Sequence, residues 1–501
     1  MDYIKYGHHI SYKNFIKLTL IYILVCTSII LTRYPDIRNE IKYFVVADNM
    51  IQSKNYLILK YFTELYPDKP PLYFWLLSNV KKHFGDNFFP WAVFLGSTLP
   101  SYLTTIMGYS LFSKIKDERT GFIISLILST VPFFIGTSIF LRMDMLMGFF
   151  IFMALSHFFS LYYEFYQKSF LNIFMLYIFI FLGIFTKGAG GFVIPISVMT
   201  GFLFLEKNIK FFKEIHFIKG VCLIVFLTAL WIFSISFFPE GKDYISLMLG
   251  QETLGRIVKS KAHIQPFYYY IARLPLLIFP YEIFLFGGII YYLKNIKSFK
   301  NWSPLEKIEF SWVIFPFVLL SCASGKLEIY LLPLFPGMAV IICSFFMRIK
   351  ETSFGKTALK ISMLSLVLPV FFNKIFGREN EPIKKLTSIS YSVIIFFIII
   401  GQFTKIYNEN FTLKPVKKII ESSKRSSVGY RFSDFINMES ELKNPVLLID
   451  DRDELINNFE KYKNTVIVSR KKYKNDLKDI PALQLKYENK NYSIYFTYFT
   501  K

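Results

Sequence analysis

The sequence repeats one feature over most of its length: apolar segments of about 20 residues, which is the length a helix needs to cross the hydrocarbon core of a bilayer. With 53% hydrophobic residues, the chain is too apolar to fold as a soluble globule. The pattern predicts an all-α polytopic membrane protein with about eleven to twelve crossings. The segments are 15–32, 89–113, 121–140, 145–163, 170–186, 191–205, 218–238, 268–293, 308–323, 329–347 and 387–404.

The composition changes after residue 405, where charged residues become dense. Short β-rich runs at 446–449, 465–468 and 492–499 alternate with a helical pattern at 453–462. These patterns predict a transmembrane domain over 1–405 and a small soluble α/β domain over 406–501. The apolar run 361–372 is shorter than a crossing and is expected to lie at the membrane interface. Its basic flanks place the C-terminal domain outside the cytoplasm.

The formal net charge of +22 is explained by the tendency of Lys and Arg to gather in cytoplasmic loops. Basic residues fill the connections 114–119, 207–219 and 294–307, each two crossings from the next. This spacing places the N-terminus in the cytoplasm and the polar loops 33–88 and 239–267 outside it. No separate basic face remains for nucleic acid. All four cysteines lie in predicted helices, so no disulfide framework or CxxC metal site is indicated.

The first outer loop contains the string Asp68-Lys69-Pro70-Pro71-Leu72. Two adjacent prolines fix the backbone and are expected to deny it a helix start, which holds the Asp-Lys pair at the membrane surface. A fixed cation there suits a lipid phosphate. A solvated charge pair beside an interfacial aromatic anchor is the alternative interpretation.

The second outer loop contains Arg256 and, shortly afterwards, His263-Ile264-Gln265-Pro266. An arginine offers a bidentate fork to phosphate oxygens, and a neutral imidazole can ligate a divalent metal ion. One histidine cannot form a metal site alone, but Asp68 could be its partner. A hydrogen-bonding surface histidine is the alternative.

Ionisable side chains also occur at the outer edge of the predicted helices. A carboxylate at membrane depth is costly, so Asp144 is a functional candidate; the alternative is a helix-start carboxylate paired with Arg142. Lys187, at the outer end of a helix, is either functional or a snorkelling lysine. Tyr330 lies in another outer turn and could belong to the aromatic belt of the membrane surface.

Taken together, these strings resemble the GT-C type glycosyltransferases that use polyprenyl-phosphate sugars. They are similar in particular to bacterial lipid A 4-amino-4-deoxy-L-arabinose transferases and, more distantly, to protein O-mannosyltransferases. The resemblance rests on four strings in order: Asp-Lys-Pro-Pro-Leu at 68–72, Thr-Lys-Gly at 186–188, the Glu-x-x-x-Arg and His-x-Gln-Pro pair at 252–266, and Lys-Leu-x-x-Tyr-Leu-Leu-Pro at 326–333.

The resemblance implies inverting transfer of a sugar from an undecaprenyl-phosphate carrier, at the periplasmic face of the bacterial inner membrane. The implied partners are this donor, membrane lipid, and an acceptor that is lipid A, another glycan or a protein hydroxyl. By resemblance, Lys69 and Arg256 bind the carrier phosphate, with Lys187 and Tyr330 beside them. Asp68 and His263 resemble a pair of ligands to a divalent metal ion, such as zinc, magnesium or manganese.

One departure from the family pattern concerns the catalytic carboxylate. The family opens its first outer loop with Asp-Glu-x-Arg-Tyr, whereas this chain has Asn39-Glu40-Ile41-Lys42-Tyr43. A carboxylate is expected as general base or as the group that orients the acceptor, so Glu40, Asp36 and Asp144 are the candidates. The Asn39 substitution also leaves open a non-catalytic scaffold. A lipid-linked-sugar flippase is a further alternative, although its polar residues would line a path near the bilayer midplane.

Overall fold

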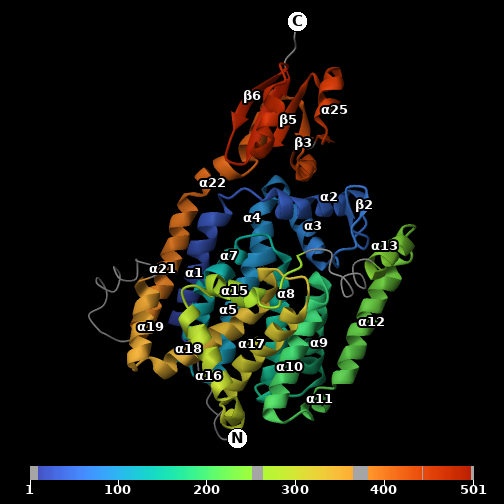
Figure 1. Cartoon of the computed structure of the whole chain (residues 1–501). Coiled ribbons are helices and arrows are strands. Elements are labelled where there is room, and N and C mark those ends of the chain that lie inside the picture. Colours follow the sequence, from blue (N-terminus) through green and yellow to red (C-terminus); the bar gives the residue numbers. More distant parts are fainter. Residues whose placement is uncertain (1–9, 251–262, 365–381, 443, 498–501) are drawn as a thin grey trace.

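The computed structural model describes residues 10–250, 263–364, 382–442 and 444–497. A helical body carries the C-terminal domain at one end and the N-terminus at the other (Figure 1). The helices that end the described part of the body, α21 (Pro382–Gln402) and α22 (Thr404–Phe411), lead directly into that domain.

Each apolar segment predicted from the sequence coincides with helix. The helices of the body are α1 (Tyr12–Ile30), α4 (Phe88–Val93), η3 (Phe94–Thr98), α5 (Leu99–Ile115), α6 (Glu118–Thr130), α7 (Pro132–Ser138), α8 (Met143–Tyr162), α9 (Phe170–Lys187), α10 (Gly190–Glu206), α11 (Phe211–Glu214), α12 (Phe217–Ile235), α13 (Gly241–Leu247), α15 (Tyr269–Ile278), α16 (Glu282–Lys294), η5 (Ile296–Asn301), α17 (Pro304–Cys322), η6 (Glu328–Leu334), α18 (Phe335–Ile349) and α19 (Ser353–Leu364).

Fewer described helices meet a strict requirement of length and apolar composition than the sequence has predicted crossings. Among the described residues, six helices are long and apolar enough to cross a membrane, or seven if α6 and α7, bent by 67° at their break, form one span. Other predicted crossings are interrupted or contain charged residues. Helices α15 and α16 are separated near Pro280, and the first two turns of α17 contain Glu306, Lys307 and Glu309. Of the predicted interfacial run 361–372, α19 covers the first residues; 365–381 lie outside the described residues.

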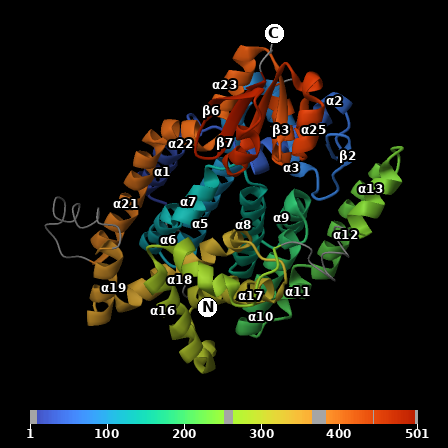
Figure 2. The same ribbon diagram turned by 45° about the horizontal axis from the view of Figure 1, so that its top comes forward.

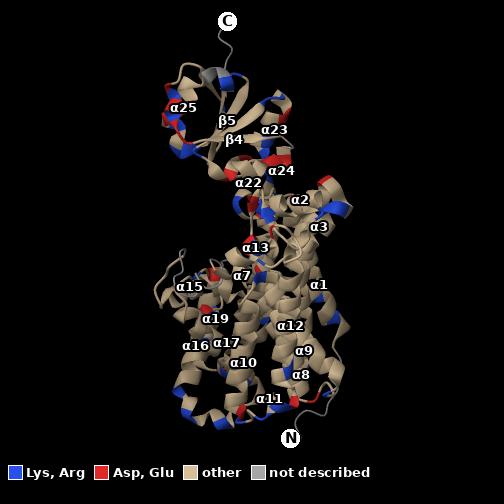
Figure 3. Ribbon diagram, turned by 90° about the vertical axis from the view of Figure 1, so that its right-hand side faces the viewer, with Lys and Arg blue, Asp and Glu red and all other residues tan. Residues whose placement is uncertain are grey.

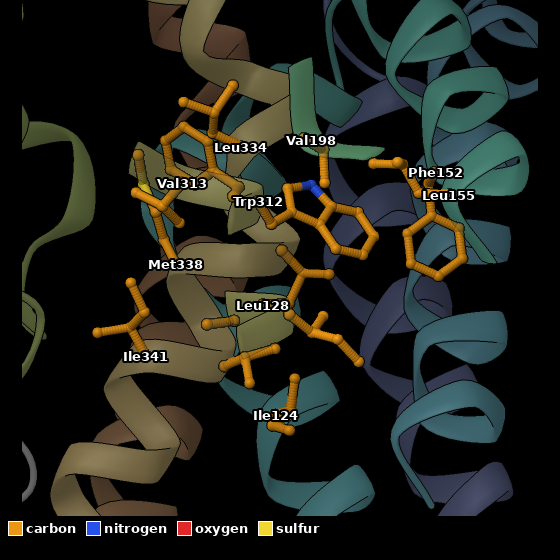
Figure 4. Close-up of a cluster of buried hydrophobic side chains, with 14 of the residues drawn as sticks. Ile124, Leu128, Phe152, Leu155, Val198, Trp312, Val313, Leu334, Met338 and Ile341 are labelled. Carbon is orange, nitrogen blue, oxygen red and sulfur yellow. The ribbon is translucent and has the colours of Figure 1, made fainter. Parts of the chain in front are cut away.

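The helical body is packed around Trp312 of α17, which is fully buried. Its indole meets side chains from α6, α8, α10 and α18, including Leu128 and Phe152 (Figure 4). The indole N–H donates to the carbonyl of Pro333 at 3.0 Å, so the one polar atom of this side chain is satisfied. Gly337 allows the close approach, because a Cβ there would lie 2.8 Å from Trp312. This packing fixes η6, the segment that carries Tyr330.

The first outer loop is an ordered platform of short elements. It contains η1 (Ile37–Ile41), α2 (Lys42–Ser53), the hairpin of β1 (Lys60–Tyr61) and β2 (Glu64–Leu65), α3 (Leu72–Phe84) and η2 (Gly85–Asn87). The expectation that Pro70 and Pro71 would deny a helix start was wrong, because α3 begins at Leu72 directly after Pro71. A proline is tolerated there since the first turn of a helix needs no N–H from it.

The C-terminal domain contains a five-stranded mixed sheet of order β4–β3–β5–β7–β6. Strands β4, β3 and β5 are parallel to one another, and β7 pairs antiparallel with both of its neighbours, β5 and β6. Three of its strands match the predicted β-rich runs. Its elements are α23 (Lys414–Ser423), β3 (Ser426–Tyr430), η7 (Ser433–Met438), α24 (Glu439–Leu442), β4 (Val446–Ile449), α25 (Arg452–Asn457), η8 (Phe459–Tyr462), β5 (Thr465–Arg470), η9 (Lys471–Tyr473), α26 (Lys474–Lys478), β6 (Leu483–Glu488) and β7 (Tyr492–Thr497).

The C-terminal domain rests directly on the platform (Figure 2). The side-chain amide of Asn437 donates to the carbonyl of Ile37 at 3.0 Å and accepts from the Tyr61 hydroxyl at 2.6 Å. Arg38 and Asp434 add an ion pair at 2.9 Å. The basic connections lie at the opposite end, with α11 and the N-terminus (Figure 3). The structure therefore separates the two faces that the charge pattern distinguishes.

Candidate functional site

Asp144 and Lys187 form an ion pair where the helical body meets the platform. Asp144 lies in the first turn of α8 and Lys187 is the last residue of α9, so each charge faces the favourable end of its own helix dipole. Their side chains are only 3% and 15% exposed. The partner of Asp144 is therefore Lys187 and not Arg142, and Lys187 turns toward a carboxylate instead of snorkelling to water.

The string after Thr186 explains the position of the lysine. Gly188 has a φ of +102°, which ends α9, and Gly191 packs against Gly183, where an added Cβ would lie 2.2 Å from the backbone. The chain can therefore reverse tightly into α10. This places the Lys187 ammonium 4.9 Å from the centre of the Tyr330 ring, a cation–π contact that joins two of the predicted site residues.

Arg142 links the same region to the platform. Its guanidinium donates to the side-chain oxygen of Asn39 at 3.4 Å and to the Tyr43 hydroxyl. Burial raises the pKa of Tyr43, and the negative charge of Asp144 raises it further. The sequence reasoning considered Arg142 only as a partner of Asp144, and so missed it as a site residue. The signal available was a second cation two residues from a membrane-depth carboxylate.

Asn39 stands between Asp36 and Arg142. Asp36 caps the N-terminus of η1, and its Oδ2 accepts from both the backbone N–H and the side-chain amide of Asn39, each at 2.9 Å. The residue that departs from the family pattern thus connects a half-buried carboxylate to a cation. We call the following residues the polar cluster: Asp36, Asn39, Tyr43, Arg142, Asp144 and Lys187.

Glu40 lies beside this cluster but is occupied by structural contacts. Both its oxygens accept from the Arg33 guanidinium at 2.6 Å, and they also accept from the backbone N–H groups of Asp36 and Leu141, each at 2.7 Å. Both side chains are almost completely buried. With four donors on its two oxygens, this carboxylate is engaged in holding the local structure. The geometry therefore favours Asp36 and Asp144 over Glu40 as the functional carboxylates.

The Asp68-Lys69 string borders the cluster from the platform side. The Lys69 ammonium lies 3.0 Å from the Asp68 carboxylate, which also accepts from the Tyr66 hydroxyl at 3.3 Å. The charge of Asp68 contributes to the raised pKa of Tyr43, so the two side chains lie within electrostatic range of each other. Both members of the charge pair are only partly exposed.

Lys326 ties the second outer loop to the Lys-Leu-x-x-Tyr-Leu-Leu-Pro string. It is 2% exposed, and its ammonium donates to the carbonyls of Gln265 at 2.8 Å and Ala323 at 2.5 Å. Its backbone N–H donates to the carbonyl of His263 at 2.9 Å. Lys326 therefore fixes the backbone at His263, a role the sequence did not reveal. Arg256 lies outside the described residues.

The predicted metal ligands were tested against the structure. A divalent ion bound by protein side chains needs several ligands of the His, Cys, Asp or Glu type. Within the described ranges, no three such residues gather, and Asp68 is paired with Lys69. The described residues therefore do not form a complete metal site. A metal at Asp68 and His263 stays a prediction.

Residues 68–233 match the model of the dolichyl-phosphate-mannose-protein mannosyltransferase family. This match covers about a third of the chain and agrees with the resemblance drawn from its motifs.

Solved structures share the fold of this chain. The crystal structure of ArnT from Cupriavidus metallidurans bound to undecaprenyl phosphate has a TM-score of 0.73 at 14% identity, and the match covers 97% of this chain and 98% of that one. The archaeal oligosaccharyltransferase AglB from Archaeoglobus fulgidus has a TM-score of 0.51 at 13% identity, with 92% of this chain and 70% of that chain covered. At these identities the likeness shows the fold.

Curated relatives match part of the chain. An uncharacterized protein of Aquifex aeolicus is 28% identical over 310 residues, which are 61% of this chain and 58% of that protein. An undecaprenyl phosphate-alpha-4-amino-4-deoxy-L-arabinose arabinosyl transferase of Yersinia pestis is 24% identical over 334 residues, which are 65% of this chain and 57% of that protein. The chain thus spans less than two thirds of the length of these relatives.

Proposed function

We propose that this protein transfers a sugar from a polyprenyl-phosphate carrier to an acceptor hydroxyl at the end of the helical body that holds the platform. The observation that carries the proposal is the polar cluster, in which Lys187 pairs with Asp144 and Arg142 donates to Asn39 where membrane helices end. A lipid phosphate lies at that depth in a bilayer. Cations held there suit a phosphate-bearing lipid donor.

The chemistry is a single displacement at the anomeric carbon. The acceptor oxygen forms a bond to that carbon as the bond from carbon to phosphate oxygen breaks, and the electron pair leaves with the phosphate. One displacement from the opposite face inverts the configuration. Lys69, Arg142 and Lys187 stabilise the charge that develops on the leaving phosphate.

The acceptor proton passes to a carboxylate. We assign this role to Asp36, because it is half-buried and only its Oδ2 is used by the contacts to Asn39. Asp144 pairs with Lys187 and orients that lysine. Glu40 has no part in proton transfer in this scheme; it anchors the segment that presents Asp36.

A groove between α10 and α17 suits the polyprenyl chain. It has a volume of about 600 Å³ and is lined by apolar side chains that include Phe192, Val193 and Phe315. The first of these lies five residues after Lys187 in the sequence. An isoprenoid tail in this groove would keep its phosphate close to the end of α9. The ArnT structure with bound undecaprenyl phosphate, which has the same fold, supports a lipid of this kind.

The acceptor we propose is lipid A or another surface glycan, reached at the periplasmic face of the bacterial inner membrane. The support is the name of the Yersinia relative, together with the basic connections at the opposite end of the helical body. A non-catalytic scaffold and a flippase remain the alternatives from the sequence. The polar cluster lies at the ends of the helices and not near their middle. This position favours a reaction at the membrane surface over transport of a lipid-linked sugar through the membrane.

Binding of undecaprenyl phosphate to the purified full chain tests the donor site. We expect this lipid to raise the unfolding temperature of the wild type, and undecaprenol, which lacks the phosphate, to raise it much less. Arg142→Gln should lose the difference between the two lipids. Lys297→Gln, at an exposed lysine of the opposite end, is the matched control and should keep it. Equal stabilisation by both lipids would overturn the proposed donor.

A further inference from the structure

A second cavity lies where the C-terminal domain meets the helical body, on the side of α1 and α21. It has a volume of about 940 Å³ and is lined by the ends of α1 and α21, by α22 and α23, and by Tyr487 of β6. The candidate membrane spans α1 and α21 end at Ile30 and Gln402. The cavity therefore opens at the depth of lipid head groups.

The floor of this cavity is built from fixed polar contacts. The hydroxyls of Thr32 and Thr404 lie 2.6 Å apart, and the Asn408 side-chain amide donates to the carbonyl of Thr32 at 2.6 Å. Gly401 lets the helices cross closely, because a Cβ there would lie 2.7 Å from the Ser28 hydroxyl. The floor of the cavity is thus formed by the packed interface between α1 and α21.

Three lysines line the cavity: Lys405 on α22, and Lys414 and Lys418 on α23. Within the described ranges, no ion pair involves any of the three. Their neighbour Lys417, by contrast, pairs with Glu441 at 2.7 Å. Glu409 is the acidic residue in the lining. The cavity therefore has a positive balance that an anionic head group would offset.

An apolar cavity adjoins this basic one. It has a volume of about 720 Å³, lies between α1 and the α4–α5 segment, and is lined by side chains such as Ile23, Trp91 and Phe94. Thr27 and Leu31 line both cavities. A molecule with a charged head and an apolar tail could therefore fill the two together.

We propose that these joined cavities bind one anionic glycerophospholipid of the surrounding bilayer, with its phosphate at the three lysines and an acyl chain along α1. No residue of the polar cluster lines either cavity. The lipid is therefore distinct from the sugar donor. It holds the C-terminal domain against the helical body, since its head group contacts α22 and α23 while its tail contacts α1.

Native mass spectrometry of the full chain tests this site with two added lipids, phosphatidylglycerol and phosphatidylcholine. The wild type should retain one phosphatidylglycerol in preference to phosphatidylcholine. The triple variant Lys405→Gln, Lys414→Gln, Lys418→Gln should reduce phosphatidylglycerol retention by about tenfold or more. The control triple variant Lys424→Gln, Lys478→Gln, Lys486→Gln removes the same charge from exposed lysines of the C-terminal domain and should bind as the wild type does.

Three results would overturn the proposal. These are equal retention of the two lipids by the wild type, unchanged retention in the first triple variant, and an equal loss in both triple variants, which would show a general effect of net charge. Displacement of the bound lipid by inorganic phosphate would also contradict the proposal, because the apolar cavity along α1 would then contribute nothing to binding. Undecaprenyl phosphate binding in the first triple variant should remain as in the wild type, which separates this site from the donor site.

Discussion

Asp144 and Lys187 join the first turn of α8 to the last residue of α9 through a nearly buried ion pair, and the same lysine lies over the ring of Tyr330. Three segments far apart in the sequence meet at this contact. The pair therefore has two roles that can be separated, one in holding the helices together and one in presenting a cation to the donor phosphate.

Removing one member of this pair should destabilise the protein, because a buried charge loses its partner. Lys187→Met is expected to cost about 3–5 kcal/mol, and Asp144→Asn a similar amount. The double variant should recover most of the stability without recovering transfer, since the cation is still missing. Unfolding in detergent and transfer activity, measured on all four proteins, check this. Activity in the double variant would contradict the role given to Lys187.

Glu40 is expected to affect folding and not the chemical step. Glu40→Gln breaks the buried pair with Arg33 and should destabilise the protein by about 3–5 kcal/mol. The fraction that still folds should keep the wild-type kcat, because Asp36 and Asp144 are unchanged. The measurement is kcat per folded protein at a temperature well below the transition. A large fall in kcat with unchanged stability would return Glu40 to the catalytic role considered from the sequence.

Arg142 should act on donor binding. Its guanidinium donates hydrogen bonds to two neutral side chains, Asn39 and Tyr43. Its positive charge is therefore suited to binding a phosphate oxygen. A hydrogen bond to a charged group contributes about 1.5–3 kcal/mol. Arg142→Gln is therefore expected to raise the donor KM by about 10- to 100-fold. Steady-state kinetics with varied donor measure this, and a changed acceptor KM alone would contradict it.

Glu488 should contribute slightly to the stability of the C-terminal domain, and this contribution should be lost in acid. Hydrogen bonds from Lys474 and Lys471 lower the pKa of this carboxyl below its ordinary value. A lowered pKa in the folded state means that the stabilisation is present at neutral pH and is lost as the pH falls through the folded-state value. Glu488→Gln should cost less than about 1 kcal/mol at pH 7, because the group is near the surface. The unfolding curves of variant and wild type should converge in acid.

Much of the fold follows from the sequence because a bilayer imposes strong rules on it. Twenty-residue apolar segments and basic connections gave helix positions and the two faces. The breaks within these segments, such as that between α15 and α16 near Pro280, did not follow, because composition does not show them. Strand β3 was missed since Ser426, Ser427 and Gly429 weaken its β pattern; Ser427 is buried in the sheet all the same.

The candidate site could be predicted in its residue types but not in its pairings. Asp144 and Lys187 were each identified as costly at membrane depth, yet nothing in the sequence indicates that they pair. Glu40 is a catalytic candidate by its place in the family string, and its contacts with Arg33 and Leu141, which favour a structural role, could not be predicted from that string. Long-range contacts of this kind depend on how the platform packs on α8, which a linear pattern does not contain.

The most direct test of the proposed transfer is mass spectrometry of lipid A and the other surface glycans from cells that lack this gene, complemented with wild type or with Asp36→Asn. The deletion should remove a glycosyl-sized mass from one glycan class, and the wild type should restore it. Asp36→Asn, present in the membrane at the same level, should not. Restoration by Asp36→Asn would contradict the assigned base, and an unchanged glycan profile in the deletion would contradict the transferase itself.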